Sequence, residues 1–161
     1  MPIKNPIIQK AAAAIDAKVQ PKYQDAYNRI VIAGMKVMFS EQLAGELMQG
    51  LKASQQPVIT AAEGVIGILG ILYKESRKTM PLAPMVMAGM NLLLQALDAI
   101  DQTGIMKIDN NAIGIGTQHY IESLLPKLGI TPDKLQAILG QVGQVASDPG
   151  KMAQIKQGAP A

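Results

Sequence analysis

Apolar residues recur at spacings of three and four over the first third of the chain, which is the pattern of an amphipathic α-helix. From Lys22 to about Ala53 this pattern predicts one long helix. Pro21, directly before it, either opens this helix at its first turn or ends the segment that precedes it. Lysine and glutamate residues interrupt the apolar stripe, so we expect one face of this helix to be solvated.

The middle of the chain is its most apolar part. Residues 58–73 are apolar almost all the way round the predicted helix, and Glu63 is their only charge. Residues 84–100 predict a second apolar helix, which the pair Thr103-Gly104 ends. A short basic linker separates the two stretches, so the pattern predicts a central apolar helical hairpin.

Two further helices are predicted after the hairpin, over residues 110–125 and 132–146. Thr131 is a suitable N-cap for the second, with Pro132 at its first position and Asp133 in its first turn. No run of alternating apolar and polar residues is long enough for a sheet. The sequence therefore predicts an all-α fold, a helical bundle of five or six helices.

The same pattern suggests how the chain is organised. We expect an N-terminal arm, a helical bundle domain and a flexible C-terminal tail, at residues 1–21, 22–146 and 147–161. The long helix and the apolar hairpin should form the core. The helices at 110–125 and 132–146 should pack outside it or against a neighbouring subunit.

Composition narrows the class of protein. The 161 residues include ten methionines, four tyrosines, one phenylalanine, no tryptophan and no cysteine. The absence of cysteine excludes a disulfide-stapled mini-domain and a cysteine-ligated metal site. The first ten residues lack the continuous apolar stretch and the cleavage site of a secretory signal, so we expect synthesis in the cytoplasm.

Candidate chemistry is sparse. His119 is the only histidine, and without a second ligand it defines no zinc site, although Glu122 is its i,i+3 neighbour on a helix. Residues 114–118, GIGTQ, lack the ending of a phosphate-binding loop, and residues 109–111, DNN, lack the spacing of a calcium loop. We therefore expect no catalytic, cofactor-binding or metal-binding residues, and no enzyme.

The net charge of +3 is mildly basic, which raises the question of nucleic acid. The chain has only two arginines, Arg29 and Arg77, and too few aromatic residues for a base-stacking platform. The basic residues near the N-terminus are interrupted by Asp16 and Asp25. We interpret them as a solvated face and expect no specific nucleic-acid partner.

The apolar hairpin has two interpretations. Stretches of sixteen to eighteen residues approach the length that crosses a bilayer, so residues 58–97 could be a membrane-spanning hairpin with Gly64 and Gly67 on a close-packing face. Alternatively, the hairpin is the buried centre of a soluble bundle. Glu63, Asn91 and Gln95 favour the buried interpretation, because polar residues are costly within a bilayer.

The methionines suggest self-association. Methionine fills irregular gaps in cores and also forms adaptable contacts at partner surfaces. The stretch 85–90 has more apolar positions than one helix face can bury in a small bundle, which favours a homo-oligomer. The candidate oligomer or membrane contacts are Gly64, Gly67, Met85, Met87 and Met90.

Two segments resemble small helical virion structural proteins of tailed bacteriophages, of the portal- or neck-associated or internal, ejected type. They are residues 29–42, RIVIAGMKVMFSEQ, and 73–101, YKESRKTMPLAPMVMAGMNLLLQALDAID. The resemblance covers about a quarter of the chain and consists of packing patterns. It implies a non-enzymatic virion component, made in the host cytoplasm, that contacts its own copies and other virion proteins such as the portal or tail.

One subclass of such proteins leaves the particle with the DNA and helps form a conduit across the host envelope, which implies transient membrane contact. The apolar hairpin suits that subclass. The alternative from another class is a holin-like protein that permeabilises the membrane with residues 58–97.

Overall fold

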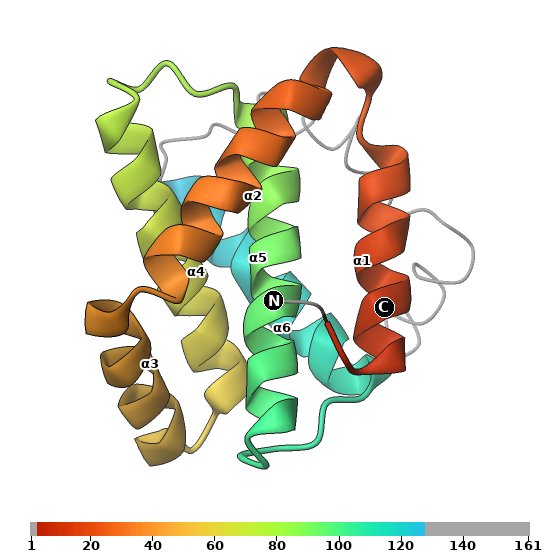
Figure 1. Ribbon diagram of the computed structural model, residues 1–161, viewed down its shortest axis with the longest axis vertical. Coiled ribbons are helices and arrows are strands. Elements are labelled where there is room, and N and C mark those ends of the chain that lie inside the picture. The colour runs from red at the N-terminus through yellow and green to blue at the C-terminus, as the bar shows by residue number, and fades with distance from the viewer. Residues whose placement is uncertain (1–2, 128–161) are drawn as a thin grey trace.

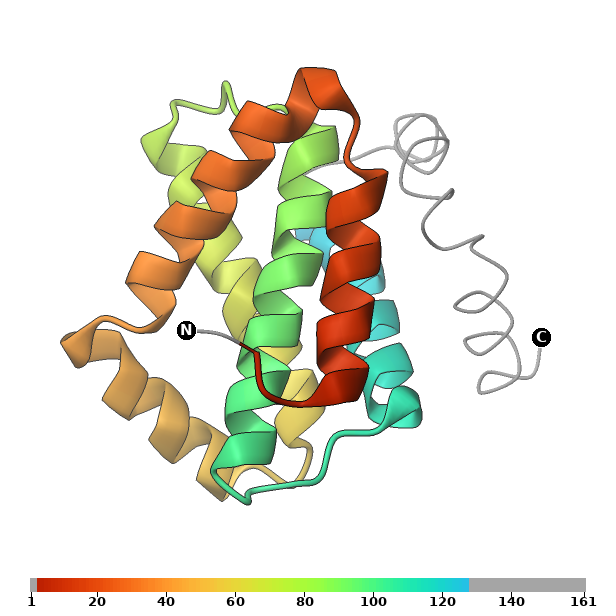
Figure 2. The same ribbon diagram turned by 45° about the vertical axis from the view of Figure 1, so that its right-hand side comes forward.

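The computed structural model describes residues 3–127 and confirms the all-α fold, since the described part contains helices and no strand. Figures 1 and 2 show the bundle. Its elements are α1 (Pro6–Lys18), a 3₁₀ turn (Pro21–Tyr23), α2 (Gln24–Met38), α3 (Glu41–Ala53), α4 (Pro57–Glu75), α5 (Leu82–Gln102) and α6 (Asn110–Lys127). The helix predicted over 132–146 and the tail at 147–161 lie outside the described residues.

The α5 helix is the centre of the bundle, and α1, α2, α4 and α6 all pack against it (Figure 1). Almost every residue from Pro84 to Ile100 is buried, because four helices pack around α5. With α4 it forms the two apolar helices of the predicted hairpin. As the sequence indicates, α5 ends at the pair Thr103-Gly104, where Gly104 has a φ of 75°.

The single helix predicted from Lys22 to Ala53 is wrong, because the chain bends between α2 and α3. Ser40 is extended, with φ −63° and ψ 149°, and its hydroxyl accepts a hydrogen bond from the Leu43 N–H at 3.3 Å. This N-cap lets a second helix begin in a new direction. The serine followed by Glu41 was the local signal for the bend, but the apolar spacing continues across it.

Within the segment 1–21, expected as an arm, residues Pro6–Lys18 form a helix of the bundle, α1. Ile8 and Ile15 of α1 are buried, and α1 lies beside α5 (Figure 2). Asn5 caps α1 by accepting hydrogen bonds from the backbone of the next turn. The backbone N–H groups of Lys4 and Asn5 donate to the Asp98 carboxylate of α5, which fixes the start of the chain to the centre of the bundle.

The α6 helix also belongs to the core, whereas we expected it outside the bundle or against a neighbouring subunit. Asp109 caps it by accepting a hydrogen bond from the Ala112 N–H at 2.9 Å. The helix packs along α4, where Gly116 lies so close to Val58 that an added Cβ would come within 2.8 Å of it. Tyr120 is fully buried, and its hydroxyl donates to the Val86 carbonyl of α5 at 2.9 Å.

Candidate functional site

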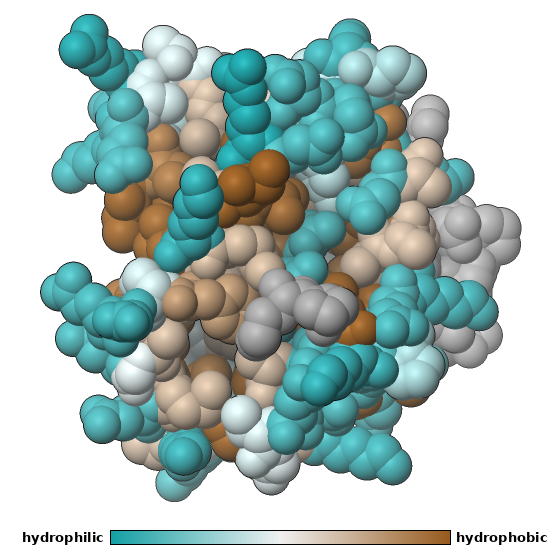
Figure 3. Space-filling view, viewed as in Figure 1, coloured by the Kyte–Doolittle hydropathy of each residue, from teal (hydrophilic) through white to brown (hydrophobic). Residues whose placement is uncertain are grey.

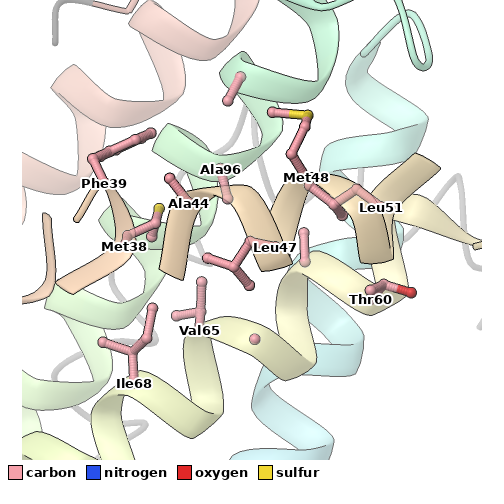
Figure 4. Close-up of a pocket in the computed structure, with 13 residues that line it drawn as sticks. Met38, Phe39, Ala44, Leu47, Met48, Leu51, Thr60, Val65, Ile68 and Ala96 are labelled. Atoms are coloured by element: carbon pink, nitrogen blue, oxygen red, sulfur yellow. The ribbon is translucent and has the colours of Figure 1, made fainter. Parts of the chain in front are cut away.

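An apolar groove opens on the face of the bundle where α3 and α5 stand apart, with α4 as its floor (Figure 4). The groove measures about 550 Å³, including the part that is open to solvent. Four helices and the residue after α2 line it, through Met38, Phe39, Ala44, Leu47, Met48, Leu51, Thr60, Ala61, Gly64, Val65, Ile68, Ala96 and Ala99. Figure 3 shows the same face of the molecule, hollowed between α3 and α5.

The groove exists because α3 is held on one side only. It packs mainly against α4 and the end of α2, and Leu51 is its single buried residue. Leu47 and Met48 stay half-buried where they line the groove. On the facing walls the side chains are small, with Ala96 and Ala99 among them, so they do not fill the space that α3 leaves.

Almost all the side chains that line the groove are apolar. Thr60 is the only one with a hydroxyl, and this hydroxyl shares a hydrogen bond of 2.6 Å with that of Ser54. Its bonding capacity is therefore already partly used by the chain itself. A groove of this kind offers a partner burial of apolar surface and little polar recognition.

The proposed contact residues are divided between the core and the surface. Met85, Met87 and Met90 are buried in α5, so they cannot contact a partner while the bundle is folded. Gly64 lines the groove, where Leu47 is its nearest neighbour. Gly67 is exposed, and a Cβ added there would meet nothing within 4 Å. Of the five residues, only the two glycines therefore lie where another molecule could reach them.

A second apolar area lies on the same face, where α2 crosses α4. Hydrophobic side chains gather there (Figure 3). Ile32 of α2 and Ile71 of α4 are large side chains with about half of their surface exposed, at 55% and 48%. Single exposed apolar residues are ordinary on protein surfaces.

His119 does not form the pair with Glu122 that the sequence allowed. Its Nε2 atom lies 3.3 Å from Glu63 Oε1 and 3.3 Å from Ser123 Oγ, whereas Glu122 accepts a hydrogen bond from Gln118. In a Ser–His–acid nucleophile the serine and the carboxylate occupy different ring nitrogens. Here both oxygens meet the same nitrogen, so this cluster lacks that geometry and links α6 to α4.

Two groups of buried polar atoms were missed by the sequence analysis, and both hold helices together. Asp98 is buried and accepts hydrogen bonds from Gln102 as well as from the backbone at the start of α1. Neighbouring Asp101 accepts from the Ile108 N–H at 3.0 Å, which holds the segment before α6. Their positions one turn apart on an apolar helix were the available sequence signal.

The second group joins α1, α2 and α5. The Tyr27 hydroxyl donates to Asp16 Oδ1 at 2.5 Å and accepts from the Asn91 side-chain amide at 2.9 Å. Burial raises the pKa of Tyr27 well above its usual value, and the hydrogen bond to the Asp16 carboxylate and its negative charge raise it further. Complete burial likewise raises the pKa of Tyr120. Both hydroxyls stay protonated and serve structure.

Among residues 3–127 no group of three or more His, Cys, Asp or Glu side chains is placed to hold a metal ion. By length and composition, α4 and α5 could each cross a membrane. In each helix this property belongs to a stretch of 18 residues. The bundle buries 44% of that stretch in α4 and 83% of it in α5. The core helix of a soluble protein passes the same test, so this property decides neither interpretation.

No family model, no curated protein and no solved structure matches this chain.

Proposed function

We propose that this chain is a non-enzymatic structural protein of a tailed-phage virion, which assembles as a homo-oligomer near the portal, neck or tail or inside the head. The observation that carries the proposal is the groove between α3 and α5, since it leaves the apolar face of α3 incompletely buried. A folded bundle with such a surface gains stability when a further chain covers it. Its function is then assembly.

The two segments that resemble phage virion proteins support the proposal by their place in the fold. Residues 29–42 form most of α2 and the turn into α3, and residues 73–101 form the α4–α5 turn and most of α5. These helices pack against each other, with Gly34 directly against Leu92. The resemblance therefore falls on one packed unit, which also forms part of the groove.

The subclass that is ejected with the DNA remains part of this proposal, because α4 and α5 are apolar enough to enter a membrane once the bundle opens. Opening would expose buried Asp98 and Asn91 and break their hydrogen bonds. A trigger, such as release from the particle, would have to supply that free energy. We expect membrane contact to be transient in this protein.

The holin-like alternative uses the same two helices as a permanent spanning hairpin. The observation in its favour is their length and hydropathy. Against it, the α5 window is mostly buried and packs with α1, α2 and α6 as well as α4. A permanent span would need none of these contacts.

The test is the mass and partition of the purified full-length chain, with and without vesicles of mixed neutral and anionic phospholipid. A water-soluble oligomer larger than 17.1 kDa that ignores vesicles supports a static virion component. A soluble species that binds vesicles and releases an entrapped dye supports the ejected type. Protein found only in the membrane fraction supports the holin-like alternative and contradicts the lead proposal.

The assignment to a virion has its own test, because a homo-oligomer alone does not identify a particle. Phage particles purified from a culture that expresses the chain at its natural level should contain it in many copies, measured by quantitative mass spectrometry. Its presence only in the cell lysate, with none in the particles, would contradict the virion assignment.

A further inference from the structure

Exposed basic side chains gather at one end of the bundle, where the α4–α5 turn and the turn between α1 and α2 lie in both views (Figures 1 and 2). We call this surface the basic end, and its residues are Lys18, Lys22, Lys74, Arg77 and Lys78. The first two are far from the other three in the sequence. Only the fold therefore brings the two groups of cations to one end.

Few acidic groups oppose these charges. Among residues 3–127, none of the five basic side chains takes part in an ion pair, and Asp25 pairs with Arg29 instead, at 3.1 Å. Asp16 accepts the hydrogen bond of the Tyr27 hydroxyl, and Glu75 is the only acidic residue of the α4–α5 turn. Two acids thus face five cations, so the basic end keeps a net positive charge.

The backbone at the end of α4 favours glycine but carries two of these cations. Arg77 and Lys78 have φ of 58° and 61°, in the left-handed region that is strained for a residue with a Cβ. Their N–H groups donate to the Lys74 and Tyr73 carbonyls, both at 2.9 Å, in the pattern of a helix end that usually has glycine where Arg77 stands. Strain of this kind concentrates where proteins bind other molecules, which favours a binding role for the two side chains.

Apolar and aromatic side chains lie among the cations. Ile71 is a large exposed residue one turn before Lys74 on α4, and positions three apart share a face of a helix. Tyr73 and Tyr23 are half-buried, and the Lys22 ammonium lies 4.9 Å from the centroid of the Tyr23 ring. Tyrosine, with its apolar ring and polar hydroxyl, is enriched where proteins meet the boundary between lipid and water.

Two kinds of anionic partner complement a basic surface, namely nucleic acid and anionic phospholipid. The phosphates of a nucleic acid would contact the cations and leave the exposed Ile71 without a role. A membrane surface uses both kinds of side chain, because lipid phosphates attract lysine and arginine while apolar side chains enter the boundary below them. The composition of the basic end therefore favours a membrane.

We propose that the basic end of the closed bundle docks on a membrane surface that contains anionic phospholipids. The α4–α5 turn joins the two apolar helices, so docking brings this hairpin to the lipid before the bundle opens. The inference deepens the transient membrane contact of the proposed function and rests on it, but it is independent of the virion assignment.

The first test is co-sedimentation of the full-length chain with vesicles. We expect binding to vesicles of mixed phosphatidylcholine and phosphatidylglycerol and much weaker binding to phosphatidylcholine alone. Salt at about 1 M should weaken the binding strongly, because it shortens the screening length to about 3 Å. Equal binding to both kinds of vesicle, or binding to neither, would overturn the proposal.

Neutralising the α4–α5 turn tests which surface docks. Near an anionic membrane each lysine or arginine contributes about fivefold to the binding constant, so the combined variant Lys74→Gln, Arg77→Gln and Lys78→Gln should bind about a hundredfold more weakly. Circular dichroism verifies that the variant is folded.

The matched control removes the same net charge from exposed lysines away from the basic end, in the combined variant Lys4→Gln, Lys52→Gln and Lys107→Gln. The Lys4 N–H is fixed to Asp98 near the end of α5, Lys52 lies at the end of α3, and Lys107 lies between α5 and α6. This variant should bind almost as tightly as the wild-type chain. Equal losses in the two variants would show that net charge alone attracts the protein, which contradicts docking by the basic end.

Glycine substitutions separate binding from folding. Arg77→Gly and Lys78→Gly relieve the strained backbone, so thermal unfolding should be unchanged or shifted to higher temperature, while each variant binds the anionic vesicles about fivefold more weakly. A purely structural role of these residues would leave vesicle binding unchanged. That result would count against the proposal.

Ile71→Ser distinguishes a membrane from nucleic acid. It should weaken binding to the anionic vesicles, because the apolar contact with lipid is lost, and it should not affect any binding to a DNA duplex. Tighter binding to the duplex than to the vesicles, together with no effect of Ile71→Ser on either, would identify nucleic acid as the partner and overturn the proposal.

The outcomes also separate this inference from the proposed function. A chain that is abundant in phage particles but binds no vesicles would leave the virion assignment standing and contradict the docking. A chain that binds vesicles through the basic end but is absent from particles would support the docking and contradict the virion assignment. Dye release that the neutralised α4–α5 turn does not change would mean that membrane contact uses another surface, and the docking alone would be wrong.

Discussion

The α5 and α3 helices differ sharply in how much of their apolar surface the bundle covers. Four helices pack against α5, and its few polar side chains, such as Asn91 and Asp98, find hydrogen-bond partners inside the core. The α3 helix packs mainly against α4 and α2, and only Leu51 is buried. An apolar stripe therefore predicts that one face of a helix is favourably buried. It does not predict that the same domain contains the helix that buries it.

The largest expected difference between the two helices concerns matched leucines. Leu92→Ala removes a fully buried side chain that packs on Gly34, so the free energy of unfolding should fall by about 2–5 kcal/mol. Leu47→Ala in α3 removes a half-buried side chain and should cost about 1 kcal/mol. Urea denaturation followed by circular dichroism measures both, and equal losses would contradict the contrast between α5 and α3.

Glycine substitutions should reverse in sign between the two helices. A Cβ at Gly89 of α5 would overlap the Tyr120 hydroxyl, so Gly89→Ala should destabilise the fold by about 1–3 kcal/mol. A Cβ at Gly45 of α3 meets nothing within 4 Å, and Gly45→Ala should stabilise the fold by about 0.5–1 kcal/mol. Thermal unfolding compares them. A loss of stability in Gly45→Ala would indicate that another chain packs closely there.

Alkaline pH should weaken the contacts around α5. Because the pKa of Tyr27 is raised in the folded state, its contribution to stability is complete below the ordinary tyrosine pKa of about 10 and is lost as the pH rises beyond it. Tyr27→Phe should lower stability by about 1 kcal/mol at neutral pH and make the decline above pH 10 shallower. Denaturation curves across this range test it, with Tyr23→Phe as the control, and an unchanged slope would count against this role.

The smallest effect is expected at the bend between α2 and α3. Ser40→Ala removes the N-cap of α3 and should cost about 0.5–1 kcal/mol. Hydrogen exchange should accelerate in the first turn of α3 and stay unchanged in α5, since the Ser40 side chain bonds only to the backbone of the bend itself. Asn5→Ala is the comparison, because Asn5 caps α1 and also donates to the Ile108 carbonyl. A uniform acceleration across all helices would show that the bend contributes to global stability.

Much of the fold follows from local patterns in the sequence. The apolar stretches at 58–73 and 84–100 correspond to α4 and α5, and the cap at Asp109 begins α6. These features depend on neighbouring residues along the chain, such as a capping side chain or a glycine with positive φ, so they can be recognised without knowledge of the fold. The all-α class and the apolar hairpin were determined at this level.

Other features of the fold depend on which helices pack against each other. The apolar stripe continues in the sequence past Ser40, yet the helix ends there. Because α3 takes a new direction after the bend, it can pack on α4. The candidate site shows the same limit. The sequence alone is compatible with an interface role for Met85, Met87 and Met90. Four helices pack against α5, however, and these methionines lie in the core.

The groove was decided by the tertiary structure alone. Gly64 and Gly67 are equivalent in sequence terms, but Gly64 lines the groove while Gly67 lies on the exposed side of α4. Periodicity specifies that a face is apolar, because side-chain direction repeats along a helix. Which face is covered is decided by contacts between residues far apart in the chain, and α3 packs against α4 without covering α5.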